Sequence, residues 1–184
     1  VERAKHFADE MNIRLSSRDG LNIALGGLTY GLNPVEIAGG YAMLANDGNY
    51  NDIGFIREIY DESGNLVYQK NSTYKKIMTD ESAYMMTDIL KETSKSGTTK
   101  FLSELPFDTA SKSGTVSHPS SSSLNNDAWN ASYTSCHTLI SWQGNLSNSL
   151  DNALLSGVTG GGYPTLVARE ILSKLYEDGL PADF

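Results

Sequence analysis

The sequence ASKSGTVSHP, at residues 110–119, decides the fold of this 184-residue chain. Its small and β-branched residues predict a strand over Thr109–Val116. At its centre, residues 112–115 combine a lysine, two hydroxyls and a glycine. An acyl-transfer site uses groups of this kind, because lysine supplies positive charge, a strand edge offers N–H groups to an oxyanion, and glycine admits a substrate close to the backbone. So short a string also suits an exposed loop, so its surroundings decide its meaning.

The residues that follow predict two more strands, at Asp127–Tyr133 and Thr138–Trp142. Between the first and second strands lies the Ser/Asn-rich segment HPSSSSLNN, residues 118–126. We expect this segment to form an exposed, mobile loop. Three strand candidates in succession favour an antiparallel sheet.

Two helices are predicted in the first quarter of the chain. Residues 1–11 place apolar side chains at helical spacing. Residues 33–46 carry stronger signals, with Asn33 as the N-cap, Pro34 at the first helical position and Glu36 completing a capping-box pattern. Helices therefore precede the strands.

Further along the chain, residues 55–60 and 66–68 predict a β-hairpin around a loop of about five residues. A third helix is predicted over residues 79–91, with Thr79 as its N-cap, and a fourth over residues 165–176. The apolar residues that we expect on one face of the fourth helix are Val167, Ile171, Leu172 and Leu175. The order of elements predicts an α+β fold, with an antiparallel sheet and flanking helices.

Composition places the chain among globular proteins, with 39% apolar and 20% charged residues. Its length of 184 residues corresponds to one domain or a large piece of one. Acidic residues outnumber basic residues by 22 to 14, and the net charge of −8 argues against nucleic acid as a partner. No apolar run reaches the length of a membrane span. Cys136 is the single cysteine, which excludes an internal disulfide.

A K-[ST]-G triplet on a strand is one of three sequence signatures of β-lactamases and penicillin-binding proteins, beside S-x-x-K and S-x-N. Four segments, in the expected order, resemble class A, bifunctional-type penicillin-binding proteins. They are LNIALGGLTYGLNPVEIAGGYAMLANDGNY (21–50), ETSKSGTTKFLSELPFDTASKSGT (92–115), DAWNASYT (127–134) and GGGYPTLVAREILSKLYEDGLPADF (160–184). The resemblance implies that residues 1–184 are the C-terminal part of a transpeptidase domain, with a partial β-lactamase/transpeptidase-like fold.

The resemblance also implies roles for the residues of the first strand. Lys112 would orient the hydroxyl groups of the active site and attract a substrate carboxylate. Ser113 would hold the position usually taken by Thr or Ser, and Gly114 would allow close approach. Thr115 would offer its hydroxyl to the carboxylate of the substrate or of a β-lactam, and its backbone N–H to the oxyanion. Lys112 and Thr115 are thus the expected catalytic residues, and all four are expected to bind substrate.

The chain departs from the family pattern in three places. The family usually has a Phe and a Gly after the tryptophan of D-A-W-F-x-G-Y-T, where this chain has Asn130 and Ser132. Residues 118–126 are longer and richer in serine than the usual connection. The segment CHTLISWQGN, residues 136–145, replaces an apolar strand that ends in W-V-G. These departures bear on substrate preference rather than on the fold.

The serine nucleophile of the family is not found in this chain. Ser72–Lys75 matches S-x-x-K and Ser123–Asn125 matches S-x-N, but the family order places both motifs before K-[ST]-G, and the nucleophile needs a rigid helix start. We therefore expect both motifs upstream of Val1, and we expect the fragment alone to be inactive. The missing part of its own domain is an expected partner, and loss of that part predicts self-association of the fragment.

The resemblance implies that the intact protein is a D,D-transpeptidase. Such an enzyme cross-links peptidoglycan stem peptides through an acyl-enzyme, and β-lactams trap that intermediate. The resemblance also implies an N-terminal glycosyltransferase domain, a membrane anchor and a location on the extracytoplasmic face of the membrane. It implies no metal or nucleotide cofactor. Two alternatives stay open: a catalytically degenerate scaffold or partner-binding module, and a serine β-lactamase.

Overall fold

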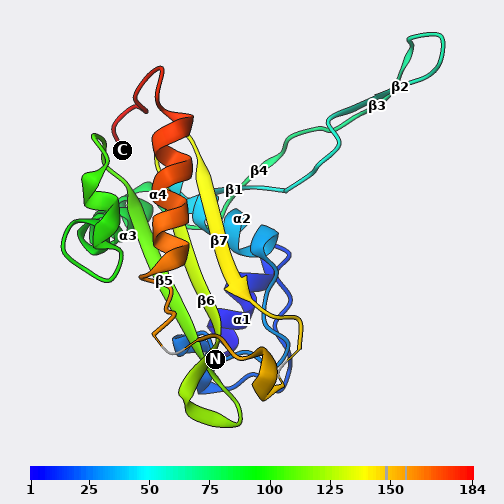
Figure 1. Cartoon of the computed structure of the whole chain (residues 1–184). Coiled ribbons are helices and arrows are strands. Elements are labelled where there is room, and N and C mark those ends of the chain that lie inside the picture. Colours follow the sequence, from blue (N-terminus) through cyan, green and yellow to red (C-terminus); the bar gives the residue numbers. More distant parts are fainter. Residues whose placement is uncertain (148, 156) are drawn as a thin grey trace.

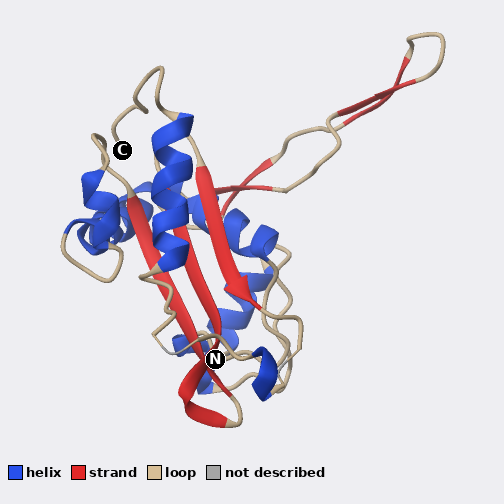
Figure 2. Cartoon of the chain, viewed as in Figure 1, coloured by secondary structure: helices blue, strands red, loops and turns tan. Residues whose placement is uncertain are grey.

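The computed structural model describes residues 1–147, 149–155 and 157–184, and a three-stranded antiparallel sheet lies at its centre (Figure 1). The strands are β5 (Ala110–His118), β6 (Ser121–Tyr133) and β7 (Thr138–Gly144), in the order β5-β6-β7. Figure 2 shows the three long strands in red with helices on both sides. The predicted α+β class, with an antiparallel sheet and flanking helices, is confirmed.

The register of the sheet makes β5 an edge strand. Gly114 lies opposite Trp129, which in turn lies opposite Trp142 on β7. Within the part of the chain that the structure describes, β5 pairs with β6 alone. Its outer edge therefore carries backbone N–H and C=O groups without a strand partner, as an extended ligand requires.

The expected loop at residues 118–126 is mostly strand, so that prediction was wrong. β5 continues to His118 and β6 begins at Ser121, and only Pro119 and Ser120 connect them. Two register shifts lie on β5 around Ser117, and the Ser120 N–H donates to Nδ1 of His118 at 3.1 Å. Polar serines suit an exposed hairpin as well as a loop, so composition alone does not separate the two.

Helices cover both faces of the sheet. On one face, Leu90 of α3 (Asp80–Lys95) packs with Ala110 and Tyr133, and α2 (Pro34–Ala45) lies beside α3. On the other face lies α4 (Tyr163–Leu175) (Figure 1). Its residue Leu172 is buried in a cluster against which Leu139 of β7 packs. The layers are therefore helix, sheet and helix. Among the three strands, the edge strand β5 is the one that contacts α3 most.

The predicted N-caps of α2 and α3 are confirmed, whereas α4 starts at Tyr163, two residues before its predicted start. Oδ1 of Asn33 accepts from the N–H groups of Val35 and Glu36, and the Glu36 carboxylate accepts from the Asn33 N–H, which is a full capping box. Thr79 caps α3 by accepting from the Ser82 N–H at 3.3 Å. α3 runs to Lys95, one turn beyond the predicted end.

Three of the four residues expected on one face of α4, Val167, Ile171 and Leu175, follow one another at four-residue spacing along one side of the helix, but that side is not the buried one. Leu172 is fully buried, whereas Val167, Ile171 and Leu175 are 47%, 45% and 50% exposed. The sheet is contacted instead by smaller residues of the same helix, among them Thr165. α4 therefore presents a half-exposed apolar stripe on its outer side.

A long arm leaves the body of the molecule between α2 and α3 (Figure 1). Its tip is the predicted hairpin, with β2 (Glu58–Tyr60) and β3 (Leu66–Gln69) shorter than expected on the first strand. At its base, β1 (Asn49–Asn51) pairs with β4 (Tyr74–Lys76). This pair was not predicted, because three residues carry too little periodicity.

The remaining elements are short. They are α1 (Glu2–Asp9) and the 3₁₀ helices η1 (Leu21–Leu25), η2 (Lys100–Glu104) and η3 (Leu150–Asn152). Among the described residues, no helix is long and apolar enough to cross a membrane. The same residues contain no group of three or more His, Cys, Asp or Glu side chains that could hold a metal ion.

Candidate active site

The four predicted site residues lie together at the middle of β5. Side chains alternate along a strand, so Lys112 and Gly114 lie on the α2/α3 face of the sheet, whereas Ser113 and Thr115 lie on the α4 face. Lys112 and Thr115 are exposed, and Ser113 and Gly114 are partly buried. β5 thus carries polar site residues on both of its faces.

Lys112 and Ser113 are held by contacts close to the strand. Nζ of Lys112 donates to the carbonyl oxygen of Ser113 at 2.6 Å. The hydroxyls of Ser113 and Thr98 lie 2.7 Å apart, and Thr98 belongs to the loop that follows α3. The loop after α3 therefore fixes one hydroxyl of the strand, while the ammonium group stays at the surface.

Thr115 is held from the opposite direction. The backbone N–H of Gly160 donates to Oγ1 of Thr115 at 3.0 Å. Because this oxygen accepts a hydrogen bond, the hydroxyl proton of Thr115 remains available for a second acceptor. The exposed Thr115 side chain can therefore act as a donor toward solvent or a ligand.

The turn at residues 160–162 passes very close to the sheet. A Cβ atom at Gly160 would lie less than 3.0 Å from the backbone of Gly114 and from the carbonyl oxygen of Trp129. A Cβ atom at Gly161 would meet the carbonyl oxygen of Thr98 equally closely. Only glycine fits at these two positions.

Gly114 itself is less crowded. A Cβ atom there would come no closer than 3.4 Å to any neighbour, and the nearest is the Cβ of Trp129. This is ordinary van der Waals contact. A side chain at Gly114 would therefore pack against Trp129 rather than clash with it.

A buried hydroxyl cluster anchors β5 just before the site. The Ser111 side chain is fully buried and hydrogen-bonds to the hydroxyls of Ser94, at 3.0 Å, and Thr99. Thr93 of α3 donates to the carbonyl oxygen of Ser111. Buried hydroxyls that are fully hydrogen-bonded hold a strand in one position. α3 and the loop after it therefore fix the position of β5 relative to the helix.

A second buried cluster joins β6 to the turn at Gly160. Asn130 donates from Nδ2 to Oγ1 of Thr165 at 3.1 Å, and Thr165 donates to the carbonyl oxygen of Gly160 at 2.7 Å. Ser132 donates to Oδ1 of Asn130. Sequence reasoning did not assign these residues to the site, although Asn130 and Ser132 are both departures from the family pattern.

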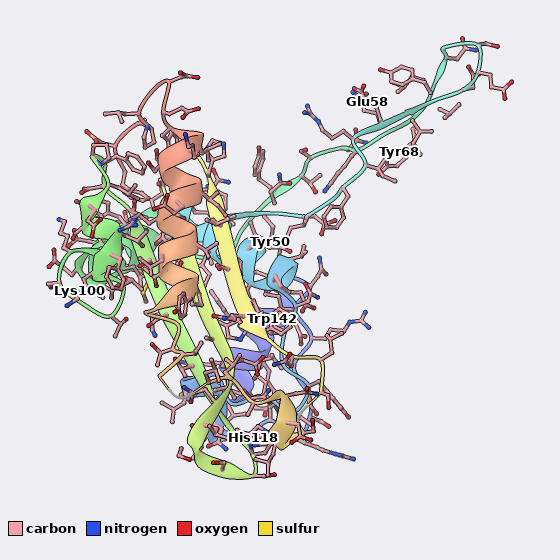
Figure 3. The ribbon with its side chains drawn as sticks, viewed as in Figure 1. Tyr50, Glu58, Tyr68, Lys100, His118 and Trp142 are labelled. Atoms are coloured by element: carbon pink, nitrogen blue, oxygen red, sulfur yellow. The ribbon has the colours of Figure 1, made fainter. Side chains whose placement is uncertain are left out.

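The aromatic residues of β6 and β7 support the sheet. Asp127 accepts from Nε1 of Trp142 at 2.8 Å, and the ring centroids of Trp129 and Trp142 lie 5.7 Å apart. Figure 3 shows Trp142 on β7 and His118 near the end of the β5–β6 hairpin. The pair stiffens the strands beside the site and leaves β5 open.

The two strings that imitate the missing motifs lie elsewhere. Ser72 precedes β4 in the exposed base of the arm, and Lys75 pairs with Glu10 at 2.6 Å. Ser123 lies on β6 rather than on a helix, and Nδ2 of Asn125 donates to the carbonyl oxygen of Val158. Neither string places a serine on a helix start, so neither has the geometry of the nucleophile.

An ion pair lies at the entrance to β5. Lys91 of α3 pairs with Asp108, two residues before the strand. The hydrogen bond from Lys91 lowers the pKa of Asp108, and the same bond raises the pKa of Lys91. The Lys91 ammonium also lies 5.6 Å from the ring centroid of Phe184, so it ties the C-terminal residues to α3.

A hollow in the surface lies away from β5. It measures about 890 Å³ and is open to solvent, between α2, the base of the arm and the turn that joins β6 to β7. Cys136 and His137 lie on its wall, but His137 bonds through Nδ1 to the Tyr176 hydroxyl at 2.7 Å. The hydrogen bond with Ser135 lowers the pKa of the Cys136 thiol. Cys136 and His137 are therefore not paired with each other as a nucleophile and a base.

Known sequences resemble this chain over most of its length. The family model of the penicillin binding protein transpeptidase domain matches residues 8–145. Penicillin-binding protein 1F of Bacillus subtilis (strain 168) is 31% identical over 179 residues, which cover 97% of this chain and 24% of that protein. Penicillin-binding protein 2a of Streptococcus pneumoniae (strain ATCC BAA-255 / R6) is 26% identical over 163 residues, which cover 88% of this chain and 22% of that protein. The chain spans about a quarter of the length of these relatives.

Solved structures share the fold. PonA1 of Mycobacterium tuberculosis in complex with penicillin V aligns with a TM-score of 0.80 at 19% identity, over 100% of this chain and 51% of that chain. Penicillin-binding protein 1A of Haemophilus influenzae aligns with a TM-score of 0.77 at 15% identity, over 100% and 32%. Each solved chain extends well beyond the part that matches.

Proposed function

This chain belongs to the penicillin-binding protein transpeptidase family, and we propose that it supplies the substrate-binding strand of a serine D,D-transpeptidase. The observation that carries the proposal is the free edge of β5, where Lys112 and the held hydroxyl of Thr115 are exposed. A positive charge, an oriented hydroxyl and unpaired backbone N–H groups together suit a peptide that ends in a carboxylate.

In this proposal the substrate is the end of a peptidoglycan stem peptide, lying along β5. Lys112 attracts its carboxylate, Thr115 donates a hydrogen bond to that carboxylate, and the Thr115 N–H stabilises the oxyanion. Ser113 lies against Thr98 and completes the line of hydroxyls on one side of the strand. Gly114 has no side chain of its own, so the peptide can approach the backbone of β5 closely there.

The serine that attacks the substrate is proposed to lie upstream of Val1, in the remainder of the same domain. Residues 1–184 would then be its C-terminal part, and alone they would not react, because a serine-type site loses most of its rate acceleration without the nucleophile. We place the intact protein on the extracytoplasmic face of the membrane, anchored by a segment outside this chain, with stem peptides and β-lactams as ligands.

Labelling with a fluorescent penicillin tests the proposal. The full-length protein should become covalently labelled, and the isolated 184-residue chain should not. Lys112→Ala in the full-length protein should slow labelling strongly. Absence of labelling in a folded full-length protein would favour the degenerate scaffold. Rapid release of hydrolysed β-lactam would indicate a β-lactamase instead.

A further inference from the structure

Two residues that depart from the family pattern meet inside the molecule. Asn130 and Ser132 lie on the α4 face of β6, and both side chains are fully buried. Ser132 donates to Oδ1 of Asn130, which turns Nδ2 of Asn130 toward Thr165. Since the acceptor end of the amide is occupied by Ser132, the amide has one satisfied orientation. The two departures therefore act as one unit.

Thr165 links the Asn130 amide to the backbone of Gly160 by two hydrogen bonds. Its hydroxyl accepts from Nδ2 of Asn130 at 3.1 Å and donates to the carbonyl oxygen of Gly160 at 2.7 Å. A hydroxyl has a single proton, so the two bonds fix how Thr165 points. Thr165 is itself fully buried, so bulk solvent does not compete for these bonds.

Gly160 in turn holds Thr115. Its backbone lies so close to Gly114 and Trp129 that a Cβ atom would not fit, and its N–H donates to Oγ1 of Thr115. A bond accepted by Oγ1 leaves the hydroxyl proton as the group that Thr115 can donate to a ligand. The buried cluster thus sets the donor direction of an exposed hydroxyl.

We propose that Asn130 and Thr165 are positioning residues that aim the Thr115 hydroxyl at the carboxylate of the substrate. The inference rests on the proposed function, because it needs a carboxylate substrate beside β5. Asn130 and Thr165 touch no substrate themselves, and they act through the backbone of Gly160. Their loss should weaken recognition of the carboxylate more than it weakens the folded structure.

A second buried hydrogen bond in the same strand supplies the matched control. The hydroxyl of Tyr133 lies 3.0 Å from Oγ1 of Thr87, and both residues are buried. This bond joins β6 to α3 rather than to the turn at Gly160. Thr165→Val removes the two buried hydrogen bonds of the Thr165 hydroxyl, and Tyr133→Phe removes a buried hydrogen bond of the same strand without touching the path to Thr115.

The experiment compares acylation of the full-length protein by a penicillin with a free carboxylate and by its methyl ester. Thr165→Val should reduce the preference for the free acid by roughly tenfold, as expected for a weakened hydrogen bond to a charged group. Thr165→Ser keeps the hydroxyl and should stay within about twofold of the wild type. Tyr133→Phe should lower the melting temperature and leave the preference unchanged.

Asn130→Asp gives an independent arm if Thr165→Val does not fold. The aspartate has the same shape but lacks the donor toward Thr165, so the preference should fall in the same way. Equal losses with acid and ester, or the same loss in Tyr133→Phe, would show a purely structural role and overturn the inference alone. A wild-type protein that neither compound acylates would overturn the proposed function and this inference with it.

Discussion

The backbone N–H of Gly160 donates a 3.0 Å hydrogen bond to Oγ1 of Thr115, across 45 residues of sequence. The bond joins the turn before α4 to the free edge strand β5. It goes with the close approach of the turn at Gly160, and it leaves the hydroxyl proton of the exposed Thr115 available to a second acceptor. Recognition of a substrate at β5 should therefore depend on residues on both sides of this link.

Thr115→Val in the full-length protein should slow acylation by penicillin by roughly 10- to 100-fold. The variant keeps the shape of the side chain but removes the donor, and hydrogen bonds to charged groups are worth about 1.5–3 kcal/mol. Thr115→Ser should retain most of the rate. Stopped-flow or gel-based acylation rates measure the effect, and an unchanged rate in Thr115→Val would exclude a carboxylate contact at this position.

Gly160→Ala should be strongly destabilising. The added Cβ atom would lie less than 3.0 Å from backbone atoms of Gly114 and Trp129, which cannot swing away as a side chain can. Overpacking of this kind costs about 1–3 kcal/mol or more. Gly179→Ala is the control, because a Cβ atom there would meet nothing within 4 Å. Thermal unfolding should separate the two variants, and equal melting temperatures would contradict the close packing of Gly160.

The Lys91–Asp108 pair should make stability depend on acid pH. The hydrogen bond from Lys91 lowers the folded-state pKa of Asp108, so the pair stabilises the fold above the unfolded-state pKa, about 3.9. That contribution is lost as the pH falls through the lowered pKa. Asp108 is 44% exposed, so we expect about 1 kcal/mol or less.

Asp108→Asn should therefore lower the melting temperature slightly at pH 7 and have no effect at a pH well below the lowered pKa, as thermal unfolding of the full-length protein would show. In a Lys91→Met background the same substitution should have little effect at either pH. A difference between the wild type and the Asp108→Asn variant that persists at low pH would rule out the ion pair as its cause.

The outer stripe of α4 should drive association of the isolated 184-residue chain. Val167, Ile171 and Leu175 are 45–50% exposed, and the solved relatives extend beyond the part that matches this chain. Ile171→Glu should shift the chain toward the monomer in light scattering. Ser173→Glu adds the same charge at another exposed position of α4 and should not. A monomeric wild-type chain would contradict this expectation.

Much of the fold could be predicted because its signals are local. The caps at Asn33 and Thr79 depend on hydrogen bonds within one turn, so residue type alone identifies them. The three strands and their antiparallel order follow from the same kind of signal. The buried side of α4 could not be predicted in this way, because it depends on Thr165 and Leu172 meeting β6 and β7.

The candidate site shows the same division. The order of motifs along the chain identifies the strand at Lys112–Thr115, because the family signature is contiguous. The support for that strand comes from Asn130, Thr165 and Gly160, which are far from it in sequence. In the sequence, Asn130 and Ser132 were visible only as departures from the family pattern D-A-W-F-x-G-Y-T. The hydrogen bond between their side chains accounts for the two departures together.

The most direct test of the central claim is a crystal structure of the full-length protein acylated by penicillin. We predict the β-lactam beside the free edge of β5, with its carboxylate about 2.7 Å from Oγ1 of Thr115 and the Gly160 N–H still donating to that oxygen. We also predict that the acylated serine lies outside residues 1–184. A carboxylate bound away from Thr115, or an acyl group on a serine of this chain, would contradict the claim.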